Sequence, residues 1–188
     1  SKYLVDFIQS KNVKVNYPSH KLDTAFDVTF GDSGPLVVLC VEYDALPEIG
    51  HACGHNIIAT ASIGAGLGLQ DIANDLGIRV KLLGTPAEEG GGGKIILLNN
   101  GAFEDAKCSM MIHPGSENVV NPTFTTIQQY TVEFFGKDAH AAGFPQEGIN
   151  ALDAQIQLFV NASTYRQQMV QSDRMHGVIP VSYTHLRA

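Results

Sequence analysis

Residues 35–56 read "PLVVLCVEYDALPEIGHACGHN", and this stretch decides the fold. The apolar run from Leu36 to Val41 has the unbroken, β-branched character of a strand that is covered on both faces. A polar loop follows, and from Asn56 to about Leu76 the chain is rich in alanine and leucine and lacks proline. We expect a helix there, with Gly77 as its C-cap. The order strand, loop, helix is typical of α/β proteins.

Further elements are expected on both sides of this unit. The patterns predict helices over residues 3–9 and 92–101 and strands over residues 26–30, 78–85 and 108–114. Their alternation predicts an α/β fold with a mixed, largely parallel sheet flanked by helices. Ligands bind such sheets at the carboxyl ends of the strands. Polar clusters follow three of the expected strands, so we expect one site at that edge.

The pattern changes near residue 121. Residues 123–137 alternate like a long strand, residues 149–169 form an amphipathic helical pattern, and residues 174–179 resemble a short strand. We therefore predict a first domain over residues 1–120, incomplete at both ends, and part of a second, α+β domain over residues 121–188.

Composition excludes several classes of function. The chain of 188 residues is 44% apolar and has a net charge of −7. No basic run is present, which argues against a nucleic-acid or membrane-surface partner. The N-terminus has neither an initiator methionine nor the pattern of a secretory signal, so we expect a fragment of a longer protein. Cys40, Cys53 and Cys108 are an odd, irregularly spaced set, which predicts reduced thiols and a cytoplasmic location. Cys40 and Cys108 are expected to be small buried hydrophobes.

The polar clusters contain side chains that bind metals. Cys53 and His55 lie two residues apart before a helix, Glu88 and Glu89 follow the next strand, and His113 follows the one after. Each has a plainer interpretation when taken alone, for example a solvated acidic pair or a strand-end histidine. Thiolate, imidazole and carboxylate together are donors for zinc or manganese, and their occurrence at three successive strand ends favours a metal site.

The adjacent glutamates suggest a division of labour. One can bind a cation while the other takes a proton from a water that the cation acidifies. A rival is a thiol hydrolase, with Cys53 as nucleophile and His51 or His55 as base. The glycine run before Lys94 is not a phosphate-binding loop, because that motif requires glycine and a hydroxyl where this chain has Glu88 and Ile95.

Four segments resemble a known family in order and spacing. They are "VEYDALPEIGHACGHN", "GTPAEEGGGGK", "MMIHP" and "FFGKDAHAAGFPQEGINALDA". They are similar to the Cys-Gly-His branch of the M20 family of metal-dependent amidohydrolases and peptidases, over roughly residues 1–179. The resemblance implies cleavage of an amide bond in a dipeptide or N-acyl amino acid. It also implies a zinc-exopeptidase-like catalytic domain, followed by a ferredoxin-like lid domain through which a homodimer can form.

The resemblance further implies two divalent metal ions, zinc or manganese, and a role for each matching residue. The expected ligands are Cys53, His55, Glu89 and His113. Glu88 matches the general base, Asp44 an acidic residue that orients the site, and His140 a lid histidine that steadies the oxyanion.

Two features depart from the family. Its last ligand, a histidine, falls beyond the end of this chain, and only about half of the lid is present. Residues 180–188 read "PVSYTHLRA", unlike the glycine-rich turn expected there, and nothing around His185 supports a ligand role. A truncated, catalytically inactive fragment is therefore a further alternative.

Overall fold

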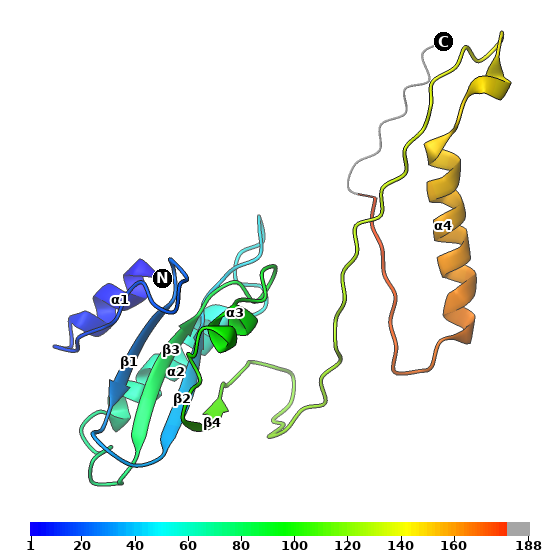
Figure 1. The fold of residues 1–188 in the computed structure, drawn as a ribbon. Helices are drawn as coiled ribbons and strands as arrows, with labels where there is room; N and C mark the ends of the chain where they lie inside the picture. The colour runs from blue at the N-terminus through cyan, green and yellow to red at the C-terminus, as the bar shows by residue number, and fades with distance from the viewer. Residues whose placement is uncertain (180–188) are drawn as a thin grey trace. The chain divides into compact units, whose positions relative to one another are not determined.

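The computed structural model describes residues 1–179, so the tail 180–188, with His185, lies outside the described part. Contacts divide the chain into two compact units, one formed by Ser1–Asn118 and one beginning at Val119 (Figure 1). Each unit is described by itself below.

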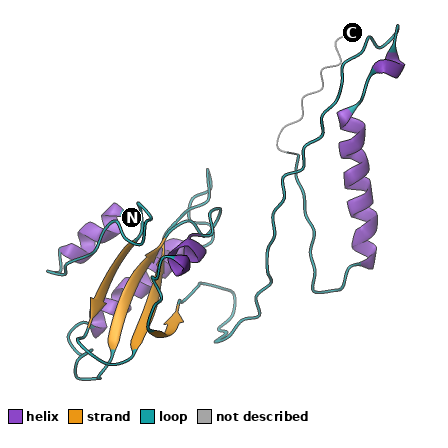
Figure 2. Ribbon diagram, viewed as in Figure 1, coloured by secondary structure: helices purple, strands orange, loops and turns teal. Residues whose placement is uncertain are grey.

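A four-stranded sheet forms the centre of the first unit (Figure 2). Its strands are β1 (Phe26–Phe30), β2 (Leu36–Glu42), β3 (Arg79–Thr85) and β4 (Ala106–Met110). Their order in the sheet is β1-β3-β2-β4. β2 pairs in parallel with both β3 and β4, whereas β1 runs antiparallel to β3. The predicted mixed, largely parallel α/β sheet is confirmed.

Three helices pack against this sheet and explain its apolar strands. They are α1 (Lys2–Gln9), α2 (His55–Leu69) and α3 (Gly93–Asn99). One apolar cluster joins α1 and α2 to the sheet through Ile8 and Ile63, and a second joins α3 to it through Leu97. Strand residues alternate between the two clusters, as Val38 and Leu39 show. The unbroken apolar run of β2 thus reflects a strand covered on both faces.

Two boundaries in the first unit differ from the prediction. α2 ends at Leu69 rather than near Leu76, and turns follow it. Asn74 lies in those turns, and its side chain exchanges two hydrogen bonds with Asp32, at 2.8 and 2.9 Å. These bonds fix a turn where alanine and leucine content alone predicted more helix. Gly77, with φ of +64°, closes the turns instead of the helix.

β4 also differs from its prediction. A buried strand was expected over residues 108–114, but β4 spans Ala106–Met110 and is largely exposed. Cys108 is exposed as well, so its predicted burial was wrong, whereas Cys40 is buried. β4 is the last strand of the sheet and pairs with β2 alone, and an edge position leaves its side chains open.

The second unit consists of extended chain and one long helix. α4 (Ala151–Tyr165) confirms the predicted helix, and the Asn150 side chain caps it by accepting from the Leu152 amide at 3.1 Å. Two short 3-10 turns, η1 (Pro145–Glu147) and η2 (Arg166–Gln168), flank α4. Within residues 1–179, no helix combines the length and the apolar character that a membrane span requires.

The strands predicted for the second unit are not formed. Residues 123–137 and 174–179 are extended, but the described chain assigns them no strand apart from a single bridge between Lys137 and Ile149. Alternation of side chains predicts a strand only when a neighbouring segment completes its hydrogen bonds. The described residues supply that neighbour at one position, so these two predictions were wrong.

Candidate metal centre

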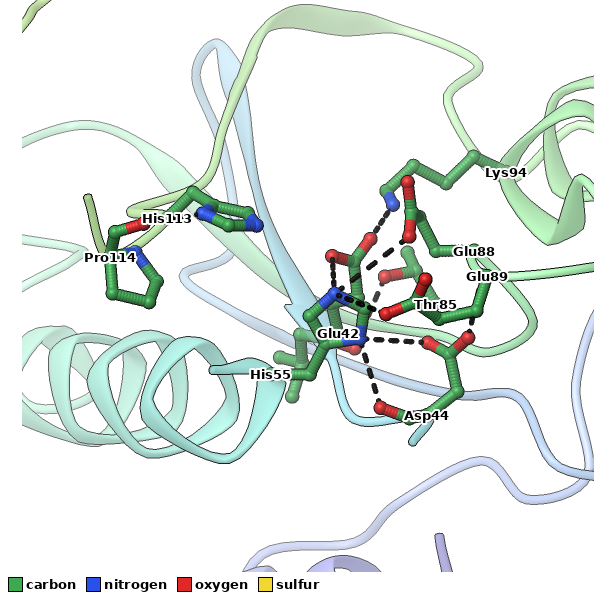
Figure 3. Close-up of polar contacts among 10 residues, drawn as sticks. Glu42, Asp44, His55, Thr85, Glu88, Glu89, Lys94, His113 and Pro114 are labelled. Carbon is green, nitrogen blue, oxygen red and sulfur yellow. Dashed lines mark hydrogen bonds and ion pairs between the residues drawn. The ribbon is translucent and has the colours of Figure 1, made fainter. Parts of the chain in front are cut away.

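The carboxyl ends of three parallel strands meet at one edge of the sheet. Glu42 is the last residue of β2, Glu89 follows β3 and His113 follows β4. His55 reaches the same place as the first residue of α2. Figure 3 shows these side chains converging, so the sheet topology brings together residues that are far apart in the sequence.

His55 lies at the centre of the cluster and is 1% exposed. Its Nδ1 atom lies 2.9 Å from the backbone oxygen of Asp44. A carbonyl oxygen can only accept, so Nδ1 carries the proton and donates it. In the neutral ring, Nε2 then presents a lone pair. Metal-binding histidines are commonly oriented in this way, through a hydrogen bond from the other ring nitrogen.

Three carboxylates face that lone pair. Nε2 of His55 lies 3.2 Å from Glu42 Oε1, 3.7 Å from Glu89 Oε1 and 3.8 Å from Glu88 Oε2. A lone pair and carboxylate oxygens repel one another unless a cation or a proton lies between them. The geometry of His55 therefore fits a bound cation.

The predicted ligands fall into two groups that share His55. Ligand atoms of Cys53, His55 and Glu89 lie within 4.8 Å of one another, and so do those of Glu42, His55 and His113. The first group offers sulfur, nitrogen and oxygen, a set that suits zinc, and the second offers one oxygen and two nitrogens. The structure thus brings all four predicted ligands to one place, while their binding of metal stays a prediction.

His113 lies at the open side of the cluster. The residue is exposed, and its Nδ1 donates to the backbone oxygen of Pro114 at 2.7 Å. Its ring centre lies 6.0 Å from that of His55, with the two rings nearly perpendicular at 83°. As in His55, a proton donated from Nδ1 leaves the lone pair of Nε2 free to bind a metal.

Asp44 connects the loops of the site. One carboxylate oxygen accepts from the Glu89 amide at 2.9 Å. The other lies 3.3 Å from His55 Nδ1 and is buried without a hydrogen-bond partner among the described residues. Asp44 therefore holds both the histidine and the loop after β3, as an orienting residue would. Glu88, by contrast, is 48% exposed and can reach both His55 and solvent.

Gly54 is required by the backbone between Cys53 and His55. Its φ is +81°, a left-handed conformation that side chains rarely adopt. A Cβ atom there would lie less than 3.0 Å from Cγ of Pro114. The glycine thus lets the loop before α2 approach the segment after β4, so that Cys53 and His55 come close to His113.

The Cys53 thiol does not resemble a catalytic nucleophile. A hydrogen bond to Glu89 is the main cause that raises the pKa of Cys53, and partial burial and the charges of nearby acids add to it. Nucleophilic cysteines need a lowered pKa, because the thiolate is the reactive form. His51, the alternative base, is exposed and belongs to neither ligand group among the described residues. The rival thiol mechanism is therefore disfavoured.

Two residues of the cluster were missed by the sequence analysis. Glu42 is 1% exposed and forms an ion pair with Lys94 of α3. The sequence held one signal, because Glu42 directly continues the apolar strand. A charged residue in such a place is buried only when it is paired. The partner, 52 positions away, could not be identified from the sequence.

His140 belongs to the second unit. Its Nδ1 accepts a hydrogen bond from the Gly143 amide at 2.9 Å, which is a local loop contact. The two units are described separately, so the structure does not relate His140 to the cluster around His55.

Fold and site together define a mixed α/β protein with a polar centre at the carboxyl edge of its sheet. No family model matches the chain. It is 45% identical over 174 residues to the Xaa-Arg dipeptidase of Mus musculus and 47% identical over 149 residues to that of Homo sapiens. These matches cover 86% and 77% of this chain. The chain itself spans 40% and 34% of the lengths of these relatives.

A solved structure agrees with the fold. A candidate aminohydrolase from methicillin resistant Staphylococcus aureus superposes with a TM-score of 0.56 at 21% identity, covering 91% of this chain and 50% of its own. The chain belongs to the M20 family of peptidases and amidohydrolases.

Proposed function

We propose that this chain provides the first part of a metal-dependent hydrolase that cleaves an amide bond in a dipeptide or an N-acyl amino acid. The observation that supports it most directly is the lone pair of His55 Nε2, which faces three carboxylates within 4 Å. Residues 1–120 would form the catalytic domain, and residues 121–188 part of a lid that also joins two copies of the chain.

Two divalent cations, zinc or manganese, suit the centre. Four carboxylates surround His55, and one ammonium group, that of Lys94, compensates one of them, which leaves three negative charges. The two ligand groups that share His55 provide a place for each cation. A divalent cation held there supplies a Lewis acid that polarises the amide carbonyl and acidifies a water.

Each remaining residue has a role that its contacts support. Glu88 reaches both the centre and solvent, so it can take a proton from the attacking water and return it to the leaving amine. Asp44 holds His55 and the Glu89 loop in place. His140 accepts at Nδ1 from Gly143, which leaves Nε2–H free to donate to the oxyanion.

We further propose dipeptides with a C-terminal arginine as substrates. The support is the identity of 45% and 47% to proteins named Xaa-Arg dipeptidase. A net charge of −7 and the acidic centre favour the approach of a cationic substrate. N-acyl amino acids are the second substrate class. The three cysteines are free thiols, which supports a cytoplasmic location.

One experiment tests the proposal and its rival together. The purified chain is assayed for bound metal by elemental analysis and for hydrolysis of an Xaa-Arg dipeptide and of p-aminobenzoyl-glutamate. We expect bound zinc or manganese that a chelator removes, and any hydrolysis should be lost with the metal and restored by added cation. Hydrolysis that survives the chelator but is lost on thiol alkylation would establish the thiol mechanism instead. A chain that binds no metal and hydrolyses neither compound would contradict the proposal.

A further inference from the structure

The contact that Lys94 makes with Glu42 has so far entered only the charge balance of the centre. Glu42 is 1% exposed, and one of its oxygens contacts the ammonium group of Lys94. The other oxygen lies 3.2 Å from Nε2 of His55, the atom expected to bind metal (Figure 3). The pair therefore links β2, α3 and the first residue of α2 at the centre.

The glycine run before Lys94 explains how the lysine reaches this place. Gly92 adopts a left-handed conformation with φ of +60°, and a Cβ atom on Gly93 would overlap the backbone oxygen of Pro86. The amides of Gly91 and Gly93 both donate to the Ala87 oxygen, at 3.2 and 3.1 Å. At Gly93, a residue with a side chain could not approach the end of β3 this closely. The run thus sets the start of α3 where Lys94 points toward Glu42.

We propose that Glu42 and Lys94 act as a positioning pair for His55. Lys94 occupies one oxygen of Glu42 and fixes the orientation of the carboxylate, so that the other oxygen borders the His55 ring at its metal-binding nitrogen. The inference rests on the proposed function, because it assigns the pair a role in cation binding. The glycine-rich segment then has a role other than phosphate binding, since it places Lys94 beside Glu42.

A test must separate the effect of the Glu42 charge on cation binding from the effect of its position. Removing Glu42 by itself takes one negative charge from the centre, and that weakens the binding of any cation nearby. The double variant Glu42→Gln/Lys94→Met removes one charge of each sign, so the net charge is unchanged. Replacing both members of a buried ion pair by neutral groups commonly preserves stability. A change in the cation affinity of this variant therefore reports on the place of the Glu42 carboxylate at the centre, and not on net charge.

The experiment measures Zn²⁺ affinity by isothermal titration calorimetry and stability by urea unfolding. We expect the double variant to unfold like the unmodified chain but to bind Zn²⁺ about 10- to 100-fold more weakly, as substitution of residues that orient metal ligands does. The matched control is Lys2→Met/Asp6→Asn, which removes an exposed ion pair of α1, and it should change neither quantity.

A second variant decides the question if the double variant does not fold. Glu42→Asp keeps the charge, and the flexible Lys94 side chain can follow it, but the carboxylate withdraws from His55. We expect weaker Zn²⁺ binding here too. Affinity equal to that of the unmodified chain in either folded variant would overturn the positioning role alone. An unmodified chain that binds no Zn²⁺ would overturn the proposed function, and the role of the pair with it.

Discussion

Replacing Gly54 by alanine should damage the centre more than its small size suggests. Gly54 has a φ of +81°, and a Cβ atom there would lie less than 3.0 Å from Pro114 Cγ. The left-handed conformation costs a residue with a side chain about 1 to 2 kcal/mol. Forcing an extra carbon into a packed contact adds about 1 to 3 kcal/mol. We therefore expect Gly54→Ala to lower the free energy of unfolding by about 2 to 5 kcal/mol.

Two glycines of the same unit serve as controls that separate these contributions. Gly50 also has a positive φ, +69°, but nothing lies within 4 Å of an added Cβ. Gly50→Ala should therefore show the backbone cost alone, about 1 to 2 kcal/mol. Gly64 lies inside α2 with open space around it. Gly64→Ala should stabilise the chain by about 0.5 to 1 kcal/mol, because alanine favours a helix.

Urea unfolding of the three variants and a Zn²⁺ titration of each form the assay. Relief of the overlap requires Cys53, His55 or the segment of Pro114 to move, so Gly54→Ala should also weaken Zn²⁺ binding. Gly50→Ala and Gly64→Ala should leave the affinity near that of the unmodified chain. If Gly54→Ala loses no more stability than Gly50→Ala and binds Zn²⁺ equally well, the close approach to Pro114 does not build the centre.

Three further predictions concern the polar residues of the centre. Glu88→Gln should abolish hydrolysis while elemental analysis finds the metal content unchanged; substantial remaining activity would refute the base role. Cys53→Ala should lower the metal content, and an unchanged stoichiometry would count against a ligand at this position. Because the pKa of Cys53 is raised, its fraction of thiolate at a given pH falls, and in metal-free chain the Cys53 thiol, followed by mass spectrometry of its peptide, should react with iodoacetamide at pH 8 more slowly than free cysteine. Glu89→Gln should speed this reaction, since it removes the main cause of the shift; equal rates would contradict that cause.

The sequence predicts an element well when the pattern of neighbouring residues matches the burial of that element. The run from Leu36 to Val41 is apolar at every position because helices cover both faces of the sheet, so periodicity and burial agree. The short helix that follows the glycine run ends before Gly101, whose φ of +78° explains the stop. In such segments, the side chains that set the structure are neighbours in the chain.

Prediction fails where a distant partner decides the structure. Residues 108–114 were predicted as a buried strand, yet the strand that forms, β4, ends at Met110 and lies at the edge of the sheet with β2 as its single neighbour. Residues 123–137 alternate like a strand, yet the described chain offers them one bridge, at Lys137. α2 ends at Leu69, and the turns after it include Asn74, which bonds to Asp32, 42 positions away. Sequence patterns describe what a segment can bury, but not what covers it.

The candidate site, too, was predicted only in part. Strand order was enough to predict that Cys53, His55, Glu89 and His113 would meet, because parallel strands end at one edge. It was not enough to find Glu42, whose importance depends on an ion pair across 52 positions. In the sequence, Glu42 resembles the polar end of a strand, and only packing makes it a buried charge.

The centre around His55 differs from the rest of the first unit, whose interior is apolar. Around His55 there are four carboxylates, of which one is compensated by an ammonium group, and an oxygen of Asp44 is buried without a hydrogen bond among the described residues. Gathering like charges in this way opposes folding, and a bound cation would offset that cost. Local violations of this kind are expected at functional sites, where binding supplies the compensating energy. The left-handed glycine at position 54 and the tight turn before Lys94 serve this centre together, since both allow close approaches of the backbone that bring its side chains to one place.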